Sequence, residues 1–240
     1  MKLTKYPQSN FLIEKGGKKI LIDPGYLTFE KYKPTDFGKL DAILITHQHP
    51  DHLDKEAIKT LSPLRIPIYG NSDVANVLSE DSVDVNVVES NTEFGAAGFR
   101  IKPVDLPHCK LLYCNQCGKQ LTASEISPQK KCKLHSDVEP KLVAGPPNTG
   151  YVINGLFFHP GDGIKLQGWN ADDAAIPING PTIDFDVAWA LSGSLQAKKI
   201  IPMHYSHPTF RTDPWEFAKA KPSGIDVEVI VLNDGESTKL

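Results

Sequence analysis

One short stretch decides how this chain is interpreted, and it is Thr46-His47-Gln48-His49-Pro50-Asp51-His52. Three imidazoles and one carboxylate fall within six positions, directly after the apolar run at 41–46. In an extended chain His47 and His49 point to the same side, and Pro50 then forces a turn that can bring Asp51 and His52 to a second direction. Without a cation, these polar groups would be packed with no evident partners, at a cost in free energy. Because imidazole and carboxylate suit Zn²⁺ and similar ions, the stretch predicts a metal site.

The overall composition is that of an ordinary globular protein. Its 240 residues suffice for one large domain or two small ones. The net charge of −3 provides no chain-wide basic field for nucleic acid or an anionic membrane. No run approaches the ~18 apolar residues of a membrane span, and no apolar segment typical of a signal peptide precedes Pro7. The four cysteines all lie within 109–132, which favours a reducing compartment. We therefore expect a cytoplasmic protein with no membrane partner.

Hydrophobic patterns along the chain predict a layered sheet protein. Alternating or apolar runs bounded by turn residues predict strands at 11–13, 19–23, 41–46, 66–69, 83–88, 99–104, 150–153, 156–158, 200–203 and 225–232. Helical periodicity predicts a helix after an Asp54 N-cap and further helices at 72–78, 186–195 and 213–220. Strands in runs, followed by strands alternating with helices, indicate an α/β fold with the helices outside.

The motif His47-x-His49-x-Asp51-His52 resembles the HxHxDH signature of the metallo-β-lactamase superfamily. The similarity continues in superfamily order through the opening strands that end at Asp23, the pair Pro107-His108, and the segments at 158–162 and 201–205. This resemblance implies an αββα four-layer sandwich. The Pro-Met-His-Tyr run at 202–205 and the Pro177-to-Pro181 segment before it are similar to the L-ascorbate-6-phosphate lactonase-like branch of small metal-dependent hydrolases.

The resemblance also implies a division of labour among the ligands. His47, His49 and His108 would hold one metal ion, whereas Asp51, His52 and His204 would hold a second, with Asp162 bridging the two. Asp51 and His204 would be the catalytic residues, Asp51 by orienting the nucleophile. The residues alone leave alternatives open: His108 as a plain loop histidine, Asp162 as a turn former, and His207 in place of His204. His159 is expected in the surroundings of the site.

Two divalent ions about 3.5–4 Å apart can share a hydroxide, because Zn²⁺ lowers the pKa of its bound water from about 15.7 to about 7. The resemblance therefore implies a metal-dependent hydrolase with two catalytic Zn²⁺ ions, or another divalent metal such as Mn²⁺. The predicted reaction is attack on an ester, lactone or phosphoester of a small-molecule substrate. Two alternatives are nucleic-acid processing, which the net charge disfavours, and a non-catalytic scaffold, which the intact ligand set disfavours. The oligomeric state, including a homo-oligomer, is left open.

A second set of metal ligands lies in a stretch of different character. Cys114, Cys117, Cys132 and His135 form a CxxC and a CxxH pair separated by 14 residues, which resembles a zinc ribbon with a structural Zn²⁺. Ordinary cysteines in a loop, or a redox role for Cys114 and Cys117, are the alternatives. We expect residues 109–147 to be a basic insertion in a hydrolase domain made of 1–108 and 148–240. It would act as a lid, a substrate reader or a dimer contact.

Overall fold

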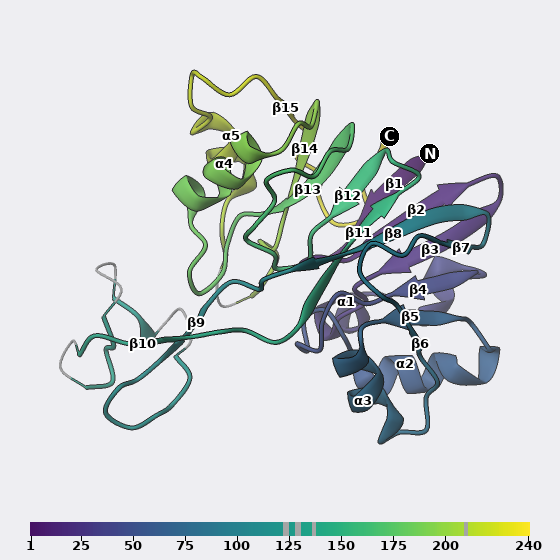
Figure 1. The fold of residues 1–240 in the computed structure, drawn as a ribbon, viewed down its shortest axis with the longest axis horizontal. Coiled ribbons are helices and arrows are strands. Elements are labelled where there is room, and N and C mark those ends of the chain that lie inside the picture. Colours follow the sequence, from purple (N-terminus) through teal and green to yellow (C-terminus); the bar gives the residue numbers. More distant parts are fainter. Residues whose placement is uncertain (122–124, 128–130, 136–137, 209–210) are drawn as a thin grey trace.

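The computed structural model describes residues 1–121, 125–127, 131–135, 138–208 and 211–240. Within these residues two seven-stranded sheets face each other, and helices cover their outer faces (Figure 1). The first sheet has the order β16 (Ser237–Lys239), β1 (Lys2–Lys5), β2 (Phe11–Lys15), β3 (Lys18–Ile22), β4 (Ala42–Leu44), β5 (Ile68–Gly70) and β6 (Asn86–Val87). The second has the order β15 (Glu228–Val229), β14 (Lys199–Met203), β13 (Asp173–Pro177), β12 (Phe157–His159), β11 (Asn148–Ile153), β8 (Phe99–Leu106) and β7 (Phe94–Ala96).

The helices lie on opposite sides of the sandwich. On the outer face of the first sheet lie α1 (Tyr26–Lys31), α2 (Lys55–Leu61), α3 (Ser72–Ser79) and the short 3₁₀ turns Pro34–Phe37 and Ser62–Leu64. The second sheet is covered by α4 (Phe185–Ser194) and α5 (Pro214–Lys219) (Figure 1). The expected αββα sandwich is therefore confirmed. Among the described residues, no helix combines the length and apolar character that crossing a bilayer requires.

Side-chain alternation along the strands produces three apolar layers between these four layers. In β2, Phe11 and Ile13 enter the central core between the sheets, whereas Leu12 faces the helices α1 to α3. In β3, Ile20 and Ile22 enter the same central core. A third cluster packs the second sheet against α4 and α5. The strands predicted at 11–13 and 19–23 thus pair as a hairpin with both faces buried, which is why their apolar residues are consecutive.

A small third sheet stands apart from the sandwich. It pairs β9 (Leu111–Tyr113) with β10 (Lys141–Val143) in antiparallel register, and it lies in the segment that projects from the body (Figure 1). This is the region expected to be an insertion, and the boundaries given for it stay a prediction. Parts of it, at 122–124, 128–130 and 136–137, lie outside the described residues.

Some predicted elements differ from those observed. The strand expected at 225–232 is reduced to Glu228–Val229, because Ile225 and Val227 pack into the cluster under α4 rather than pairing along a strand. The strand expected at 83–88 is only Asn86–Val87. The edge pair of β1 and β16 was not predicted, since Lys2 and Lys5 hide its pattern. The N-cap of α2 is confirmed, because the Asp54 side chain accepts from the Ala57 backbone N–H.

Candidate metal centre

The predicted ligands follow the carboxyl ends of strands that share one edge of the sandwich. The segment at 47–52 follows β4, whereas His108 follows β8, Asp162 follows β12 and His204 follows β14. Strands β3 and β4 run parallel, as do β12, β13 and β14, so their carboxyl ends meet at the same edge. Residues that are distant in the sequence are therefore brought to one place by the topology.

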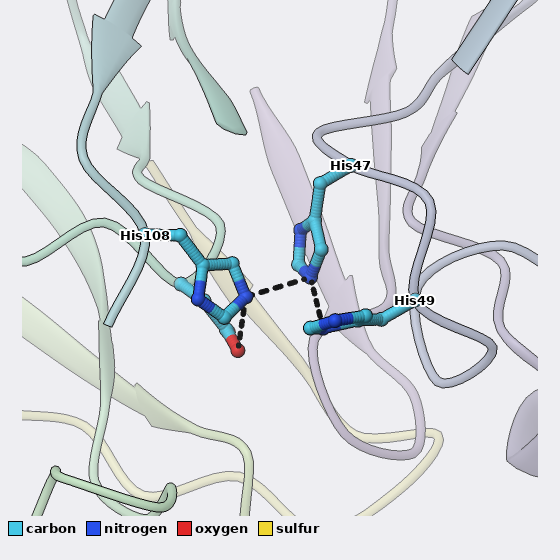
Figure 2. Close-up of side chains that lie close together, drawn as sticks. His47, His49 and His108 are labelled. Carbon is cyan, nitrogen blue, oxygen red and sulfur yellow. Dashed lines mark hydrogen bonds and ion pairs between the residues drawn. The ribbon is translucent and has the colours of Figure 1, made fainter. Parts of the chain in front are cut away.

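The first group contains three imidazoles that point toward one another (Figure 2). His47 Nε2 lies 3.1 Å from His49 Nδ1 and 3.2 Å from His108 Nε2. The opposite nitrogen of His108, Nδ1, lies 2.6 Å from the Cys109 carbonyl oxygen, which accepts a hydrogen bond from it. Because Nδ1 is engaged by this carbonyl, Nε2 is the nitrogen that faces the group, the orientation in which backbone carbonyls usually hold metal-ligating histidines.

The second group is formed by Asp51, His52 and His204. His204 Nε2 lies 3.0 Å from Asp51 Oδ2, and His52 Nε2 lies 3.9 Å from the same oxygen. The turn at Pro50 is closed by bonds from the backbone N–H groups of His52 and Leu53 to the His49 carbonyl oxygen. This turn places Asp51 and His52 in a second ligand group beside the first, with the His52 ring 4.0 Å from the His47 ring between centroids.

Asp162 lies between the two groups. Its Oδ2 atom is 3.5 Å from His108 Nε2, whereas its Oδ1 atom is 3.3 Å from His52 Nε2 and 3.6 Å from His204 Nε2. One carboxylate oxygen thus faces each group, which is the arrangement needed to bridge two cations.

Buried polar atoms at the centre fit a cation. Among the described residues His52 Nε2, Asp162 Oδ1 and His204 Nε2 are buried and make no hydrogen bond. An unsatisfied buried polar atom costs roughly 1–3 kcal/mol, so three of them converging on one space is an expensive arrangement by itself. A set of nitrogen and oxygen donors aimed at common points is what Zn²⁺ and related divalent ions prefer. The residues present therefore fit the metal pair that the sequence predicts.

The electrostatics divide the histidines into two kinds. Burial, together with the charge of His52, lowers the pKa of His47 well below its usual value, and burial lowers the pKa of His49 to about 4. Both imidazoles are therefore neutral near pH 7, which is the form that binds metal. Burial also opposes the charged form of His52, but the carboxylates of Asp162, Asp23 and Asp51 outweigh it and raise the His52 pKa. The carboxylates therefore make the surroundings of His52 favour positive charge, whereas the surroundings of His47 and His49 disfavour it.

Backbone conformations that side chains rarely adopt gather around the site. Asp23 has φ = 49° and His204 has φ = 67°, and the His204 backbone N–H donates to the carbonyl oxygen of Gln8, itself at φ = 57°. Left-handed non-glycine residues of this kind cost about 1–3 kcal/mol each and concentrate at functional sites. Gly25 is required for another reason, because a Cβ atom there would lie 2.0 Å from the Asp51 carbonyl oxygen.

Other polar residues hold the ligands in place. Asn148 Oδ1 accepts from the Asp162 backbone N–H, while its amide donates to the Pro160 carbonyl oxygen. His159 donates from Nε2 to the Ser9 carbonyl oxygen and is fully buried, so it supports the loop before Asp162, as expected, rather than joining either group. His207, the sequence alternative to His204, is in neither ligand group; its Nε2 atom lies 3.1 Å from the Tyr26 hydroxyl.

A cavity of about 370 Å³ lies against both ligand groups. The ligands that line it are His49, Asp51, His108, Asp162 and His204. Tyr26 and His207 also line it, and nothing in the sequence analysis singled out Tyr26. A signal for Tyr26 was present only in its position just after the Asp23-Pro24-Gly25 turn. The size is that of a pocket for a small molecule.

The cysteine-rich segment forms a separate ligand group. Cys114, Cys117 and His135 place their ligand atoms within 4.8 Å of one another. Cys132 is not part of that group, although it packs in the same small cluster as Cys114, and burial followed by a hydrogen bond with Cys114 raises the Cys132 pKa. Burial acts in the same sense on Cys114, but backbone N–H groups of Cys117 and Gln116 outweigh it and lower the pKa of that thiol. Cys109 belongs to neither group and is buried in the main core.

Comparisons with known proteins agree with this fold. Residues 2–204 match the family described as the beta-lactamase superfamily domain. Igni18, a metallo hydrolase from the archaeon Ignicoccus hospitalis, has a similar structure with a TM-score of 0.70 at 24% identity, covering 99% of this chain and 97% of Igni18. The metallo-beta-lactamase fold protein YhfI from Bacillus subtilis aligns with a TM-score of 0.67 at 16% identity, covering 99% and 98% of the two chains. The fold and the family match thus place this chain in the metallo-β-lactamase class.

A relative in sequence identifies the family within this superfamily. A UPF0173 metal-dependent hydrolase of Pyrococcus horikoshii is 31% identical over 96% of this chain and 95% of its own length. The chain belongs to this family, the UPF0173 metal-dependent hydrolases within the beta-lactamase superfamily. The expectation of a metal-dependent hydrolase is confirmed at that level.

Proposed function

We propose that this enzyme hydrolyses an ester, lactone or phosphoester bond of a small molecule at a centre for two divalent ions. The observation that carries the proposal is the position of Asp162, whose two carboxylate oxygens face different ligand groups. One ion would be held by His47, His49 and His108, and the other by Asp51, His52 and His204. Zn²⁺ suits this mixture of nitrogen and oxygen ligands, and Mn²⁺ is the alternative.

The chemistry combines what the ions supply with what the side chains do. When bound, the two ions supply Lewis acidity for the carbonyl or phosphoryl oxygen and a nucleophile derived from water near neutral pH. Asp51 is the ligand suited to orient that nucleophile and accept its proton, because its side chain is 22% exposed and lines the cavity. His204 lies beside this carboxylate, with Nε2 3.0 Å from Asp51 Oδ2, and both side chains would hold the same ion.

The proposal also includes the class of bond that is hydrolysed. Similarity to the L-ascorbate-6-phosphate lactonase-like branch rests on Pro202-Met203-His204-Tyr205 at the end of β14, and it favours a lactone or related ester. The nucleic-acid alternative finds less support, because Lys119 contacts Glu125 and Lys131 Nζ lies 3.0 Å from Glu139 within the insertion. These lysines are neutralised in part before any phosphate backbone could approach.

A structural Zn²⁺ in the insertion is a separate proposal. Cys114, Cys117 and His135 form the ligand group, and Cys132 beside Cys114 would complete it. Four nitrogen and sulfur ligands with no open position are typical of structural rather than catalytic zinc.

The reaction can be tested with protein loaded with Zn²⁺ or Mn²⁺ and assayed on phenyl acetate, γ-butyrolactone and bis(p-nitrophenyl) phosphate. We expect hydrolysis of at least one substrate, lost after chelation and reduced roughly 100-fold or more in Asp162→Ala. Asp226→Ala, which removes an exposed carboxylate away from the cavity, is the matched control and should retain activity. A metal-loaded wild type that cleaves none of the three, or an Asp162→Ala variant of equal activity, would contradict the proposal.

A further inference from the structure

The insertion contributes to the wall of the cavity beside the metal centre. Its contribution is the side chains of Leu111, Gln120 and Leu121, which line the same cavity as Asp51, Asp162 and His204. Leu111 begins β9 only three positions after His108, so the strand that leaves the first ligand group passes directly along the cavity. The segment that projects in Figure 1 is therefore joined at its base to the site.

Alternation along β9 divides its side chains between the cavity and a small core. Leu111 lines the cavity, whereas Leu112 enters a cluster with Cys114, Leu121, Ile126 and Cys132. The backbone N–H of Leu121 donates to the Leu112 carbonyl oxygen at 2.7 Å. Leu121 is thus fixed against β9 and contributes to both the cluster and the cavity wall.

This cluster is too small to hold the hairpin by itself. Among the described residues of the insertion it has five buried members, of which two are the cysteines Cys114 and Cys132. The turn between Leu112 and Leu121 is closed at Cys114, whose N–H donates to the Lys119 carbonyl oxygen and whose carbonyl oxygen accepts from Gly118. Segments with so little core usually need a metal ion to fold, and the ligand group of Cys114, Cys117 and His135 lies at this turn.

The charges of the cavity wall restrict the substrate. Among the described residues that line the cavity, none is a lysine or an arginine. Away from the ligands, the insertion presents Leu111 and Leu121 together with the amide of Gln120. The body presents Pro50, Gly180 and Pro181 together with the polar side chains of Gln8, Tyr26, Asn179 and His207. Desolvating a charged group against the two leucines is costly, whereas an apolar group gains about 25 cal/mol for each Å² buried.

We propose that the insertion, fixed by its own metal ion, is the substrate-reading wall of this enzyme, in which Leu111 and Leu121 bind an uncharged apolar substituent beside the hydrolysed bond. The substrate class is then a neutral carboxylic ester or lactone with an apolar side. This inference rests on the proposed function, because it takes the metal centre to be the place where the bond is cleaved.

Binding of n-alkyl hydroxamates tests the proposal without using turnover. The hydroxamate group chelates a divalent ion, and the tail can be lengthened from acetohydroxamate to hexanohydroxamate without adding charge. Isothermal titration of the metal-loaded protein should show Kd falling roughly two- to fourfold for each methylene that is added. Adipic monohydroxamate, whose tail ends in a carboxylate, should bind about tenfold more weakly than hexanohydroxamate.

Variants of the two leucines test whether they are the residues that contact the alkyl tail. Leu111→Asn and Leu121→Asn should keep the acetohydroxamate Kd within about twofold and lose most of the gain per methylene. The content of insertion metal shows whether each variant keeps its insertion folded. If Leu121→Asn loses this metal, Leu111→Asn alone is used to test the wall. Cys117→Ser, at an exposed ligand outside the cavity, should flatten the chain-length dependence as well. Leu142→Asn, on the exposed face of β10, is the matched control and should bind the series as the wild type does.

The outcomes separate this inference from the function on which it rests. Wild-type protein that binds acetohydroxamate but gains nothing from longer tails, or prefers the carboxylate tail, would overturn the apolar wall alone. If Cys117→Ser protein has lost its insertion metal but Kd still falls with each added methylene as in the wild type, the wall does not depend on that ion. Failure of acetohydroxamate to bind the metal-loaded wild type would overturn the proposed catalytic centre and this inference together.

Discussion

The Nδ1 atom of His52 lies 2.7 Å from the Oδ2 atom of Asp23, and both side chains are fully buried. The same carboxylate accepts hydrogen bonds from the backbone N–H and from the hydroxyl of Thr46, each at 2.7 Å. Asp23 therefore fixes His52 with its proton on Nδ1, so that Nε2 faces Asp162. The orientation of a ligand on one side of the centre is thus set by a residue at the end of β3 that is not itself in either ligand group.

Replacement of Asp23 by Asn should weaken the catalytic metal centre. The amide offers one acceptor oxygen to three donors, so either His52 or Thr46 loses its partner. We expect the affinity for the second catalytic ion to fall about 10- to 100-fold, as measured by competition with a chromogenic chelator. Asp213→Asn at the N-cap of α5 is the matched control, because asparagine caps helices as well as aspartate does. Unchanged metal affinity in Asp23→Asn would show that the Asp23–His52 contact has no role in metal binding.

Gly145 permits the chain to pass close to His108. A Cβ atom at this position would lie 2.3 Å from His108 Nδ1, so Gly145→Ala must displace the imidazole or the chain that returns from the insertion. We expect lower occupancy of the first catalytic ion by elemental analysis. Gly224→Ala is the matched control, because nothing lies within 4 Å of the added methyl group. The explanation fails if the two variants carry the same amount of catalytic metal.

Loss of a cysteine ligand should affect the insertion alone. Cys114→Ser removes a thiol whose Sγ atom accepts from the Gln116 backbone N–H, and we expect the loss of about one Zn²⁺ per chain. The segment at 109–147 should then become sensitive to limited proteolysis, while the catalytic ions are retained. Cys109→Ser changes a buried cysteine outside the ligand group, so its metal content should match that of the wild type. Equal metal content and protease resistance in Cys114→Ser would argue against a structural zinc.

The buried Lys5 gives a pH dependence of stability. Its Nζ atom lies 2.8 Å from Asp234 Oδ1, and burial, offset only in part by Asp234, lowers the Lys5 pKa from 10.5 to about 8. Between these values the unfolded chain binds more protons than the folded chain, so the unfolding free energy rises with pH. Urea unfolding should show the wild type gaining up to about 3 kcal/mol relative to Lys5→Met as pH rises from about 8 to about 10.5. A difference that stays constant or falls across this window would contradict the assignment.

Much of the centre could be predicted because four of its seven ligands fall within six consecutive positions. His47, His49, Asp51 and His52 follow one apolar strand, and their spacing alone indicated a metal. His108, Asp162 and His204 come from three other strands, and only the resemblance to a family pointed to them. Nothing local in the sequence indicates that β8, β12 and β14 end at the same edge as β4.

The features that could not be predicted depend on long-range packing. Lys5 lies in an edge strand that looks polar, and only the fold shows that it is buried against Asp234 and under the Tyr205 ring. Leu111 and Leu121 have no pattern that distinguishes a cavity wall from a core. Their place follows from the turn at Cys114, which folds one back beside the other. The same reason explains why Ile225 and Val227 packed under a helix instead of extending a strand.

We infer that Asp162 joins the two groups of ligands into one centre for two ions. The most direct test is elemental analysis of protein purified without chelator, comparing the wild type with Asp162→Ala. We predict about three ions per chain in the wild type, two at the catalytic centre and one in the insertion. Asp162→Ala should lose catalytic metal and keep the zinc of the insertion. A wild type that carries no metal, or an Asp162→Ala variant with the full complement, would contradict the account.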